Sequence, residues 1–383
     1  MRRLYILAII SLLLFTFPIT PTTVAHRALS SSTQTSDPYA EKLRAFEEFV
    51  RQQMSKEKIP GLTIGFVKDD YVWVKGFGYA DLENKTPARA DSSYRLASVQ
   101  KSMTAAAILQ LAEQGKINLD AEIQTYVPYF PKKKYPVTIR QLLGHLGGIP
   151  HYVNRDIEQH IKVHKTTREA IAIFENYDLV AEPGTKFSYS SYGYNLLGAA
   201  IEGASGQSYA DYMREHIWQP LGMTETRMDD PLDLIPNRVR GYQVVEGAIK
   251  NSEFIDVSSR FAAGGARGTV LDLLKFMKGL NEGKLLSRES LALMYTPMKT
   301  RDGKFSGFPR TAGYAMGWNV VPQTSGLVVI NDGGQQETRT FILNFPSKRF
   351  AIAVAQNLEL DDDGAIFLRL YELVLNEKFS LGS

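Results

Sequence analysis

The chain has 383 residues, 44% hydrophobic and 22% charged, which is typical of a globular protein of one large or two moderate domains. Its 44 basic and 41 acidic residues nearly balance, which argues against a nucleic-acid-binding protein with a concentrated positive charge. The absence of cysteine excludes disulfides, thiol catalysis, iron–sulfur clusters and cysteine-based zinc sites.

The N-terminal segment has the layout of a secretory signal peptide. The basic start Met1-Arg2-Arg3 precedes an apolar run, Leu4 to Phe17, that is shorter than a typical membrane-spanning helix. Thr23-Val24-Ala25 then offers small residues for cleavage. We expect residues 1–25 to be removed, which leaves a secreted or periplasmic protein without a membrane span. An uncleaved membrane anchor is the alternative. Residues 26–37, rich in Ser and Thr, are expected to form a flexible linker.

The elements that follow are a helix, two strands, a helix-rich middle, three more strands and a last helix. Apolar residues along one side predict the first helix from Tyr39 to Met54. The β-rich runs predict strands at Leu62–Val67, Tyr71–Tyr79, Leu327–Ile330, Thr338–Phe345 and Phe350–Ala355, before a helix at Ala365–Leu375. Turn residues, including Gly333-Gly334 and Pro346-Ser347-Lys348, are expected to separate the last three strands.

The simplest packing of these elements is an α+β fold. All five strands would form one antiparallel sheet flanked by helices, with the terminal helices on one face. Residues 38–124 and 251–383 would make up this α/β lobe, and residues 125–250 an inserted helical lobe. We expect a small-molecule site in the cleft between the two lobes.

The stretch from Arg95 to Leu111 is the most informative for chemistry. From Val99 onward it predicts a helix that is apolar nearly all round, hence buried, and that ends at Gly115. Ser98 begins this helix and Lys101 follows three residues later, on the same face. Ser98 could be a simple helix cap. However, a capping box places Glu or Gln where Lys101 stands, and a cation there opposes the helix dipole at a cost of about 0.3–1 kcal/mol.

The same conflict has a functional interpretation. Burial and the helix dipole would lower the pKa of Lys101, so that its amine is neutral near pH 7. A neutral amine one turn away can take the proton of the Ser98 hydroxyl and turn its oxygen into a nucleophile. Because Ser-x-x-Lys is common by chance, the hypothesis needs a second motif.

A second motif lies between Glu182 and Gly198, where the sequence predicts a turn, an aromatic loop and the start of a helix. Tyr189 in this loop fits two interpretations. It is either a core or rim aromatic with a satisfied hydroxyl, or a tyrosine whose hydroxyl joins the proton network of Ser98 and Lys101.

With these motifs the sequence resembles the serine β-lactamase and penicillin-binding-protein superfamily. It is most similar to the branch of class C β-lactamases, D-alanyl-D-alanine carboxypeptidases, penicillin-binding esterases and LACTB-like peptidases, and the resemblance extends from about Tyr39 to the last helix. The motifs that carry it are Gly76–Asp81, Ser98–Lys101, Ile139–His145, Glu182–Gly184, Tyr189–Ser191, Ala263–Gly265 and Asp332–Gly334.

The resemblance implies a β-lactamase/transpeptidase-like fold and a role for each matching residue. Ser98 would be the acylated nucleophile, Lys101 its base, and Tyr189 the group that moves protons to the leaving group and the deacylating water. The backbone N–H of Ser98 and that of Gly334, on the first C-terminal strand of the sheet, would form an oxyanion hole, worth about 2.7–4 kcal/mol per donor. His145 is expected to hold loops in place. Neither a metal nor a cofactor is expected.

Two departures from the family pattern concern substrate binding. Ser191 replaces the usual Asn and has a shorter side chain. Asn331-Asp332-Gly333 replaces Lys or His, then Thr or Ser, then Gly, so the cation that helps to bind a substrate carboxylate is missing and an anion stands beside its place. If both side chains faced the cleft, anionic ligands would be disfavoured. Alternation along a strand would let only one face it, and Arg339 on the next strand is a candidate for compensation.

Other mechanisms find less support. The chain has no Gly-x-Ser-x-Gly and no histidine after His216, contrary to an α/β-hydrolase. His160 and His164 have the spacing of a zinc pair but lack the intervening Glu and a clear third ligand, so a solvated helix face is favoured. Glu359–Gly364 resembles a calcium loop, but Leu370 occupies the place of the bidentate Glu, so a charged helix N-terminus is favoured.

The sequence therefore predicts an exported serine hydrolase that forms an acyl-enzyme on amide or ester bonds. The substrate is left open between a small peptide, a cell-wall stem peptide, an ester and a lactam. The altered third motif favours a peptidase or esterase over an efficient β-lactamase. A catalytically decayed binding protein on the same scaffold is the alternative, and the intact Ser98, Lys101 and Tyr189 speak for the enzyme.

Overall fold

The computed structural model describes residues 37–152, 161–359 and 364–380. The predicted signal peptide, nearly all of the predicted linker, His160 and most of the calcium-loop-like segment lie outside these residues. Within the described ranges no helix is both long and apolar enough to cross a membrane.

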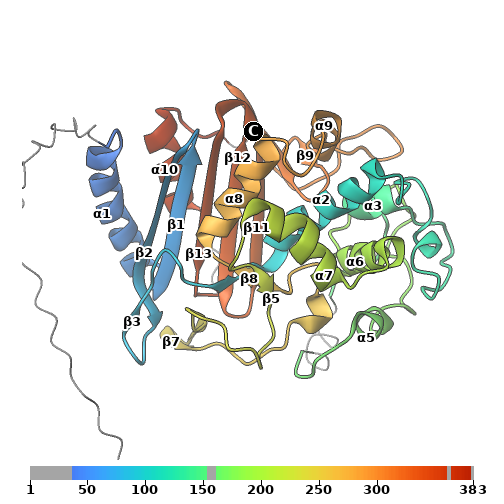
Figure 1. The fold of residues 1–383 in the computed structure, drawn as a ribbon, viewed down its shortest axis with the longest axis horizontal. Coiled ribbons are helices and arrows are strands. Elements are labelled where there is room, and N and C mark those ends of the chain that lie inside the picture. The colour runs from blue at the N-terminus through green and yellow to red at the C-terminus, as the bar shows by residue number, and fades with distance from the viewer. Residues whose placement is uncertain (1–36, 153–160, 360–363, 381–383) are drawn as a thin grey trace, which may run out of the picture. The chain divides into compact units, whose positions relative to one another are not determined.

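The central sheet is antiparallel and larger than predicted, with eight strands instead of five. Figure 1 shows it at the centre of the fold. Its order is β3 (Thr86–Pro87), β2 (Tyr71–Asp81), β1 (Gly61–Lys68), β13 (Phe350–Gln356), β12 (Thr338–Phe345), β11 (Gly326–Gln335), β10 (Asn319–Gln323) and β9 (Gly313–Tyr314). All five predicted strands are present.

The three additional strands have weak sequence patterns. Strands β3 and β9 have two residues each, too few to show an alternation. Strand β10 contains Pro322, which cannot donate a ladder hydrogen bond. Because β9 pairs only with Asn319 and Val320, Pro322 lies where β10 forms the edge of the sheet.

Gly333-Gly334 was expected to mark a turn, and this was wrong, whereas the family resemblance correctly placed Gly334 on the first C-terminal strand. Both lie inside β11, opposite Thr340 and Arg339 of β12. The reason for glycine is a close approach of another backbone segment, because a Cβ on Gly333 would lie 2.6 Å from the amide nitrogen of Ser98. A glycine in a strand interior often marks such a site.

The terminal helices α1 (Ala40–Lys56) and α10 (Ala365–Leu375) cover one face of the sheet, as expected (Figure 1). Ring contacts hold them there: Phe46 of α1 lies 6.1 Å from Trp73, and Tyr371 of α10 lies 6.4 Å from Phe345. On the opposite face, α8 (Val270–Asn281) is joined to β12 by two hydrogen bonds between the amides of Asn281 and Asn344.

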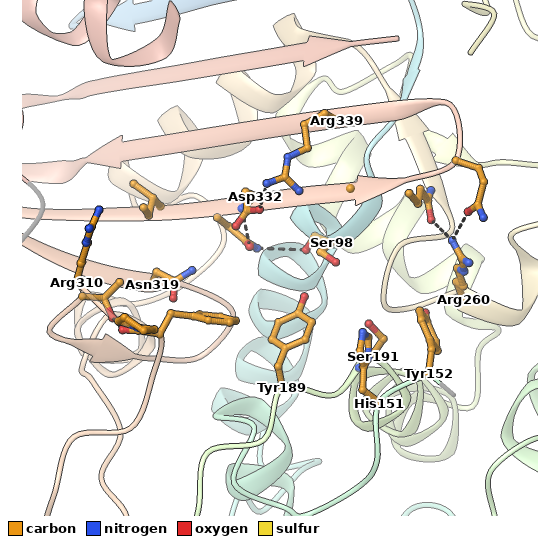
Figure 2. Close-up of a pocket in the computed structure, with 18 residues that line it drawn as sticks. Ser98, His151, Tyr152, Tyr189, Ser191, Arg260, Arg310, Asn319, Asp332 and Arg339 are labelled. Atoms are coloured by element: carbon orange, nitrogen blue, oxygen red, sulfur yellow. Dashed lines mark hydrogen bonds and ion pairs between the residues drawn. The ribbon is translucent and has the colours of Figure 1, made fainter. Parts of the chain in front are cut away.

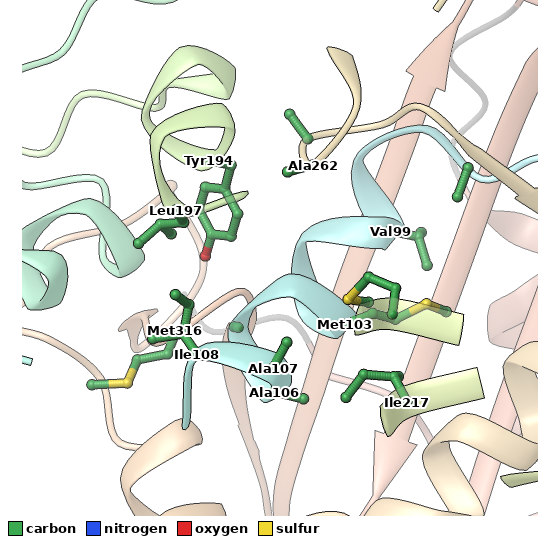
Figure 3. Packing of buried hydrophobic residues seen from close by; sticks show 14 of the residues in the cluster. Val99, Met103, Ala106, Ala107, Ile108, Tyr194, Leu197, Ile217, Ala262 and Met316 are labelled. Carbon is green, nitrogen blue, oxygen red and sulfur yellow. The ribbon is translucent and has the colours of Figure 1, made fainter. Parts of the chain in front are cut away.

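The helix predicted after Ser98 is α2 (Gln100–Glu113), preceded by the 3₁₀ turn η1 (Ala97–Val99). The buried position expected from its apolar sequence is confirmed. Figure 3 shows Met103, Ala107 and Ile108 of α2 packed among buried side chains from several other segments, which include Leu197 and Met316. Gly115 has the left-handed φ of 69° that a residue ending a helix favours.

The remaining helices and two smaller sheets complete the described fold. The helices are α3 (Ile139–Leu143), α5 (Thr167–Ala172), α6 (Ser191–Ser205), α7 (Tyr209–Met213) and α9 (Arg288–Met294). Two smaller sheets comprise β4 (Tyr94–Arg95), β8 (Ala266–Gly268) and β5 (Arg227–Met228), and the pair β6 (Tyr242–Val245) and β7 (Ala248–Asn251). The described residues from Glu41 onward pack as one unit, so the division into two lobes at residues 125–250 stays a prediction.

Candidate active site

The site begins with the turn that presents Ser98. Ala97, immediately before it, has a left-handed φ of 49°, which costs a non-glycine residue about 1–2 kcal/mol. The surrounding backbone holds this strain, since the amide of Leu96 donates to the carbonyl of Ala266 on β8. Neither η1 nor α2 has a side-chain cap, so Ser98 is not a helix cap.

Lys101 and Ser98 are directly joined. The Nζ atom of Lys101 lies 2.8 Å from the Oγ atom of Ser98 in a hydrogen bond, and it donates to the carbonyl of Ala263 at 2.9 Å. Lys101 has no exposed surface. Its Nζ atom also lies 5.0 Å from the ring centre of Tyr189 and 5.8 Å from that of Tyr194. The amine of Lys101 is therefore buried among aromatic rings, within hydrogen-bond distance of the Ser98 hydroxyl.

This environment changes the protonation of the amine. Burial lowers the pKa of Lys101 well below 10.5, repulsion from Arg260 lowers it further, and attraction by Asp332 opposes the shift. The neutral form is therefore populated at lower pH than in a free lysine, and a neutral amine has the lone pair that a base needs.

Tyr189 also approaches the Ser98 hydroxyl. Figure 2 shows its ring with the hydroxyl pointing toward Ser98. Burial raises the pKa of Tyr189, and a hydrogen-bonding interaction with Ser98 partly offsets this. The phenol is therefore protonated at neutral pH and can donate a proton, which agrees with the functional interpretation of this residue.

His145 fixes the loop that carries Tyr189. Its carbonyl accepts from the amide of Ser188 at 2.9 Å and its Nδ1 atom accepts from the amide of Ser190 at 3.1 Å, so it holds both neighbours of Tyr189. The two rings lie 4.3 Å apart. Burial lowers the pKa of His145 well below 6.5, which keeps the imidazole neutral. This geometry agrees with the architectural role expected for it.

Asn331 and Asp332 of the altered third motif face different partners. The side-chain nitrogen Nδ2 of Asn331 donates to the carbonyl of Ser98 at 3.2 Å and to the hydroxyl of Ser102 at 2.9 Å, so this side chain joins β11 to the start of α2. Asp332 forms an ion pair of 2.9 Å with Arg339 on β12. Arg339 thus balances the charge of Asp332, and whether it also replaces the missing substrate-binding cation stays a prediction.

A pocket of about 650 Å³ opens over Ser98 (Figure 2). Of the predicted substrate-binding residues, Ser191, Asn331, Asp332 and Gly334 line this pocket, as does the predicted catalytic Tyr189. Gly333 does not line it, and lies instead against the backbone amide of Ser98. Lys101 lies beneath the serine. Ser191 contacts the ring nitrogen Nδ1 of His151 through its amide at 3.2 Å and Tyr152 through its side chain.

Several lining residues were not predicted from the sequence. They include His151, Tyr152, Arg260, Arg310, Asn319, Gln335 and Gln336. Arg260 is notable among them because its guanidinium is buried at the pocket wall. In the sequence Arg260 is a single basic residue shortly before the Ala263–Gly265 motif, and a single basic residue does not predict a binding site.

Among residues 37–152, 161–359 and 364–380 no group of three or more His, Asp or Glu side chains is arranged to hold a metal ion. His164 lies 3.7 Å from a carboxylate oxygen of Asp256, while its proposed partner His160 lies outside the described residues.

Comparisons with known proteins agree with this site and fold. The family described as Beta-lactamase matches residues 46–375. The chain is 30% identical over 369 residues to the mitochondrial serine beta-lactamase-like protein LACTB of Homo sapiens, covering 74% of this chain and 66% of that protein. It is 28% identical over 329 residues to penicillin-binding protein 4* of Bacillus subtilis (strain 168), covering 80% and 70%. The chain thus spans just under two thirds of its mitochondrial relative.

Among solved structures, the octameric penicillin-binding protein homologue from Pyrococcus abyssi aligns with a TM-score of 0.74 and 29% identity, covering 88% of this chain and 78% of that one. The predicted β-lactamase/transpeptidase-like fold class is confirmed. The chain belongs to the Beta-lactamase family, within the serine β-lactamase and penicillin-binding-protein superfamily of hydrolases.

Proposed function

We propose that this protein hydrolyses amide or ester bonds through an acyl-enzyme on Ser98. One observation carries the proposal: a lysine without exposed surface has its amine 2.8 Å from the Ser98 hydroxyl, at the floor of a pocket. Burial of a lysine amine is costly, and a lowered pKa at such a position is typical of a catalytic base.

The chemical steps follow from this geometry. Lys101 takes the proton of Ser98 as the Oγ atom attacks the substrate carbonyl carbon, and the carbonyl electron pair moves to the oxygen. The amides of Ser98 and Gly334 would stabilise that oxyanion. The bond to the leaving group then breaks, Tyr189 passes its proton to the departing nitrogen or oxygen, and the proton held by Lys101 returns to Tyr189. In the second half a water molecule attacks the acyl carbon and gives up a proton to this pair, the bond to Ser98 breaks, and the Ser98 oxygen takes that proton back as the acid is released.

The substrate class is the second part of the proposal. We favour small peptides and esters over lactams, because Asn331 is turned toward α2 and Asp332 is paired with Arg339. The same reason counts against a cell-wall stem peptide whose terminal carboxylate would have to bind beside these two residues. Neither side chain then offers the cation that the family pattern supplies for a substrate carboxylate. With residues 1–25 removed as a signal peptide, the enzyme would act outside the cytoplasm.

The decisive experiment labels the nucleophile. A fluorophosphonate probe and a penicillin probe are incubated with the wild-type protein, and the tryptic peptide Leu96–Lys101 is analysed by mass spectrometry. Ser98 is the only hydroxyl-bearing residue in that peptide, so its mass shift identifies the site. We expect an adduct in the wild type and none in Ser98→Ala or Lys101→Met.

A matched control is Lys116→Met, which removes an exposed lysine beyond the end of α2 and should label like the wild type. Lys101→Met removes a cleavage site, so its peptide is sought as Leu96–Lys116. A folded wild-type protein whose Ser98 stays unmodified by every probe would contradict the proposal and favour a binding protein on this scaffold.

A further inference from the structure

Arg260 is a buried cation on the wall of the Ser98 pocket. It lies at the end of the 3₁₀ turn η5 (Ser258–Arg260) and is only 6% exposed. Its Nη1 atom donates to the side-chain oxygens of Gln335 at 2.9 Å and Gln336 at 3.4 Å, and the guanidinium lies 5.1 Å from the ring centre of Tyr152. All three partners are neutral.

The charge of Arg260 lacks a carboxylate counterpart among the described residues. The groups that act on it most are the side chains of Tyr152, Arg95 and Tyr192, and one of these is itself a cation. A buried charge without an opposite charge is expensive, and proteins pair or hydrogen-bond such groups. The uncompensated guanidinium is therefore a candidate binding group for an anion that enters the pocket.

The other arginines of the pocket differ from Arg260. Arg339 is paired with Asp332 at 2.9 Å, so its charge is largely balanced. Arg310 is exposed, where water screens its charge. Figure 2 shows Arg260 and Arg310 on opposite sides of Ser98. A substrate that spans the pocket therefore has Arg260 on one side of the serine.

The residues around Arg260 also suit a carboxylate. A guanidinium presents parallel N–H groups that match a carboxylate in two hydrogen bonds, and such pairs are strongest where water is excluded. The two glutamine amides on Nη1 belong to β11 and the turn after it, so they hold the guanidinium beside the strand that also carries Gly334. An anion bound to Arg260 would lie near the end of β11, and the proposed oxyanion-hole residue Gly334 lies on the same strand.

We propose that Arg260 binds a carboxylate of the substrate, so that the preferred substrates are amides or esters with an acidic group close to the scissile carbonyl. This rests on the proposed hydrolase function. In this scheme Arg260, at the end of η5, supplies the cation that Asn331-Asp332 does not. The expectation that anionic ligands are disfavoured then applies only to the Asp332 side of the pocket.

The test compares substrates of equal shape that differ in charge. In the first arm, N-acetylglutamate and N-acetylglutamine p-nitroanilides, in both enantiomers, carry the charge in the acyl part. In the second arm, N-acetylalanyl-4-aminobenzoate and N-acetylalanyl-4-aminobenzamide carry it in the leaving group. We expect wild-type kcat/KM to favour the acid at least tenfold in one arm, which identifies the part of the substrate that Arg260 contacts.

Two variants of Arg260 test the assignment. Arg260→Gln should lower the acid-to-amide ratio of kcat/KM at least tenfold, and Arg260→Lys should retain part of it, because an ammonium keeps the charge but not the paired donors. The acid-to-amide ratio compares two substrates of the same variant, so a general loss of activity lowers both values of kcat/KM and leaves the ratio unchanged. Arg349→Gln is the matched control: it removes an exposed guanidinium paired with Asp69 and should keep the wild-type ratio.

Binding without turnover separates this proposal from the hydrolase proposal. Calorimetry with the Ser98→Ala variant should show N-acetylglutamate or 4-acetamidobenzoate bound at least tenfold tighter than its amide, and Arg260→Gln in the same background should abolish the difference. Equal affinity for acid and amide in both pairs, or a preference that survives Arg260→Gln, overturns the role of Arg260. A retained preference without any Ser98-dependent hydrolysis overturns the enzyme and leaves the anion site standing.

Discussion

At the scale of single residues, the site is a balance of charges around one amine. Lys101 is buried, Arg260 repels its protonated form and Asp332 attracts it. The first two effects favour the neutral base and the third opposes it. Removing either charged neighbour should therefore move the pKa of Lys101 in a known direction, while the amine keeps its contact with Ser98.

The first prediction concerns the pH dependence of kcat/KM with an uncharged ester. The rate constant should rise with pH as Lys101 loses its proton, through an apparent pKa below the 10.5 of an ordinary lysine. Asp332→Asn removes an attraction that stabilises the cation, so the rise should move to lower pH. Arg260→Gln removes a repulsion, so the rise should move to higher pH.

Opposite shifts in these two variants are difficult to obtain from a general structural defect, which would move both in one direction. A flat wild-type profile from neutral to alkaline pH, or shifts of equal sign, would contradict Lys101 as the base. Stopped assays with a neutral ester such as p-nitrophenyl acetate give the profile, and the Ser98→Ala variant gives the uncatalysed background.

The contrast between Lys101 and Arg260 also shows what the sequence could predict at this scale. Ser98 and Lys101 are three residues apart on one helix, so the local pattern alone places them together. Arg260 reaches the same pocket from more than 150 positions downstream, and only the packing of η5 against the turn after β11 brings it there. Its pairing with neutral amides has no counterpart in the sequence pattern.

At the scale of elements, the site depends on the approach of β11 to the turn η1. Strands β12 and β13 and helix α10 were predicted nearly to the residue, because alternation and turn residues mark their ends. The prediction ended strand β11 too early, at Ile330, because Gly333-Gly334 is the usual signature of a turn. Here the missing side chain instead leaves room for the backbone of Ser98, a contact between segments more than 200 positions apart.

The second prediction tests that contact with two neighbouring glycines. In Gly333→Ala the new Cβ would meet the amide nitrogen of Ser98 at 2.6 Å and the carbonyl of Leu96 at 2.8 Å, so backbone must move. We expect kcat/KM to fall at least 100-fold, since a displaced oxyanion donor costs about 2.7–4 kcal/mol. The free energy of unfolding should fall by about 1–3 kcal/mol, as for other overpacked sites.

Gly334→Ala is the matched variant. Its Cβ would lie 2.7 Å from the Nη1 atom of Arg339, which is the end of a flexible side chain and can shift. The backbone N–H of residue 334 is kept, so the loss of kcat/KM should be at least tenfold smaller than for Gly333→Ala. Equal losses in the two variants would mean that the closeness of Gly333 to Ser98 is not what positions the site.

At the scale of the whole molecule, a buried ion cluster joins the small sheet of β4, β8 and β5 to the central sheet. Asp229 accepts from the Nε atom of Arg95 at 2.6 Å and lies 3.4 Å from Arg267 and from Arg238. The carbonyl of Arg95 accepts from the hydroxyls of Thr338 and Thr340 on β12. Arg95 stands three residues before Ser98, so the cluster anchors the turn that carries the nucleophile. Its members are too far apart in the chain for the sequence to predict.

The last prediction is that Asp229→Asn destabilises the fold strongly. The side chains of Arg95 and Arg267 are almost fully buried. The variant takes from Arg267 its paired carboxylate and leaves Arg95 with Glu337 alone, 3.3 Å away, which costs about 3–5 kcal/mol of unfolding free energy. Asp120→Asn is the control, because its pair with Arg140 is largely exposed and worth about 0–1 kcal/mol. Denaturant unfolding of both variants measures the difference, and equal losses would contradict the role of the cluster.

The pH dependence of the same measurement identifies the carboxylate responsible. Burial raises the pKa of Asp229, but the charges of Arg267 and Arg95 outweigh it, so the pKa lies below 3.8 in the folded protein. A lowered carboxylate pKa stabilises the fold fully above the pKa of the unfolded chain, and this stabilisation is lost as pH falls through the folded value. The contribution of Asp229 to the difference between wild type and Asp229→Asn should therefore shrink as pH falls below about 4. Asp229 also raises the pKa of the neighbouring Glu337, so the two proteins are compared in a Glu337→Gln background, in which Asp229 titrates alone. A difference that stays constant in acid would mean that packing, not charge, makes Asp229 important.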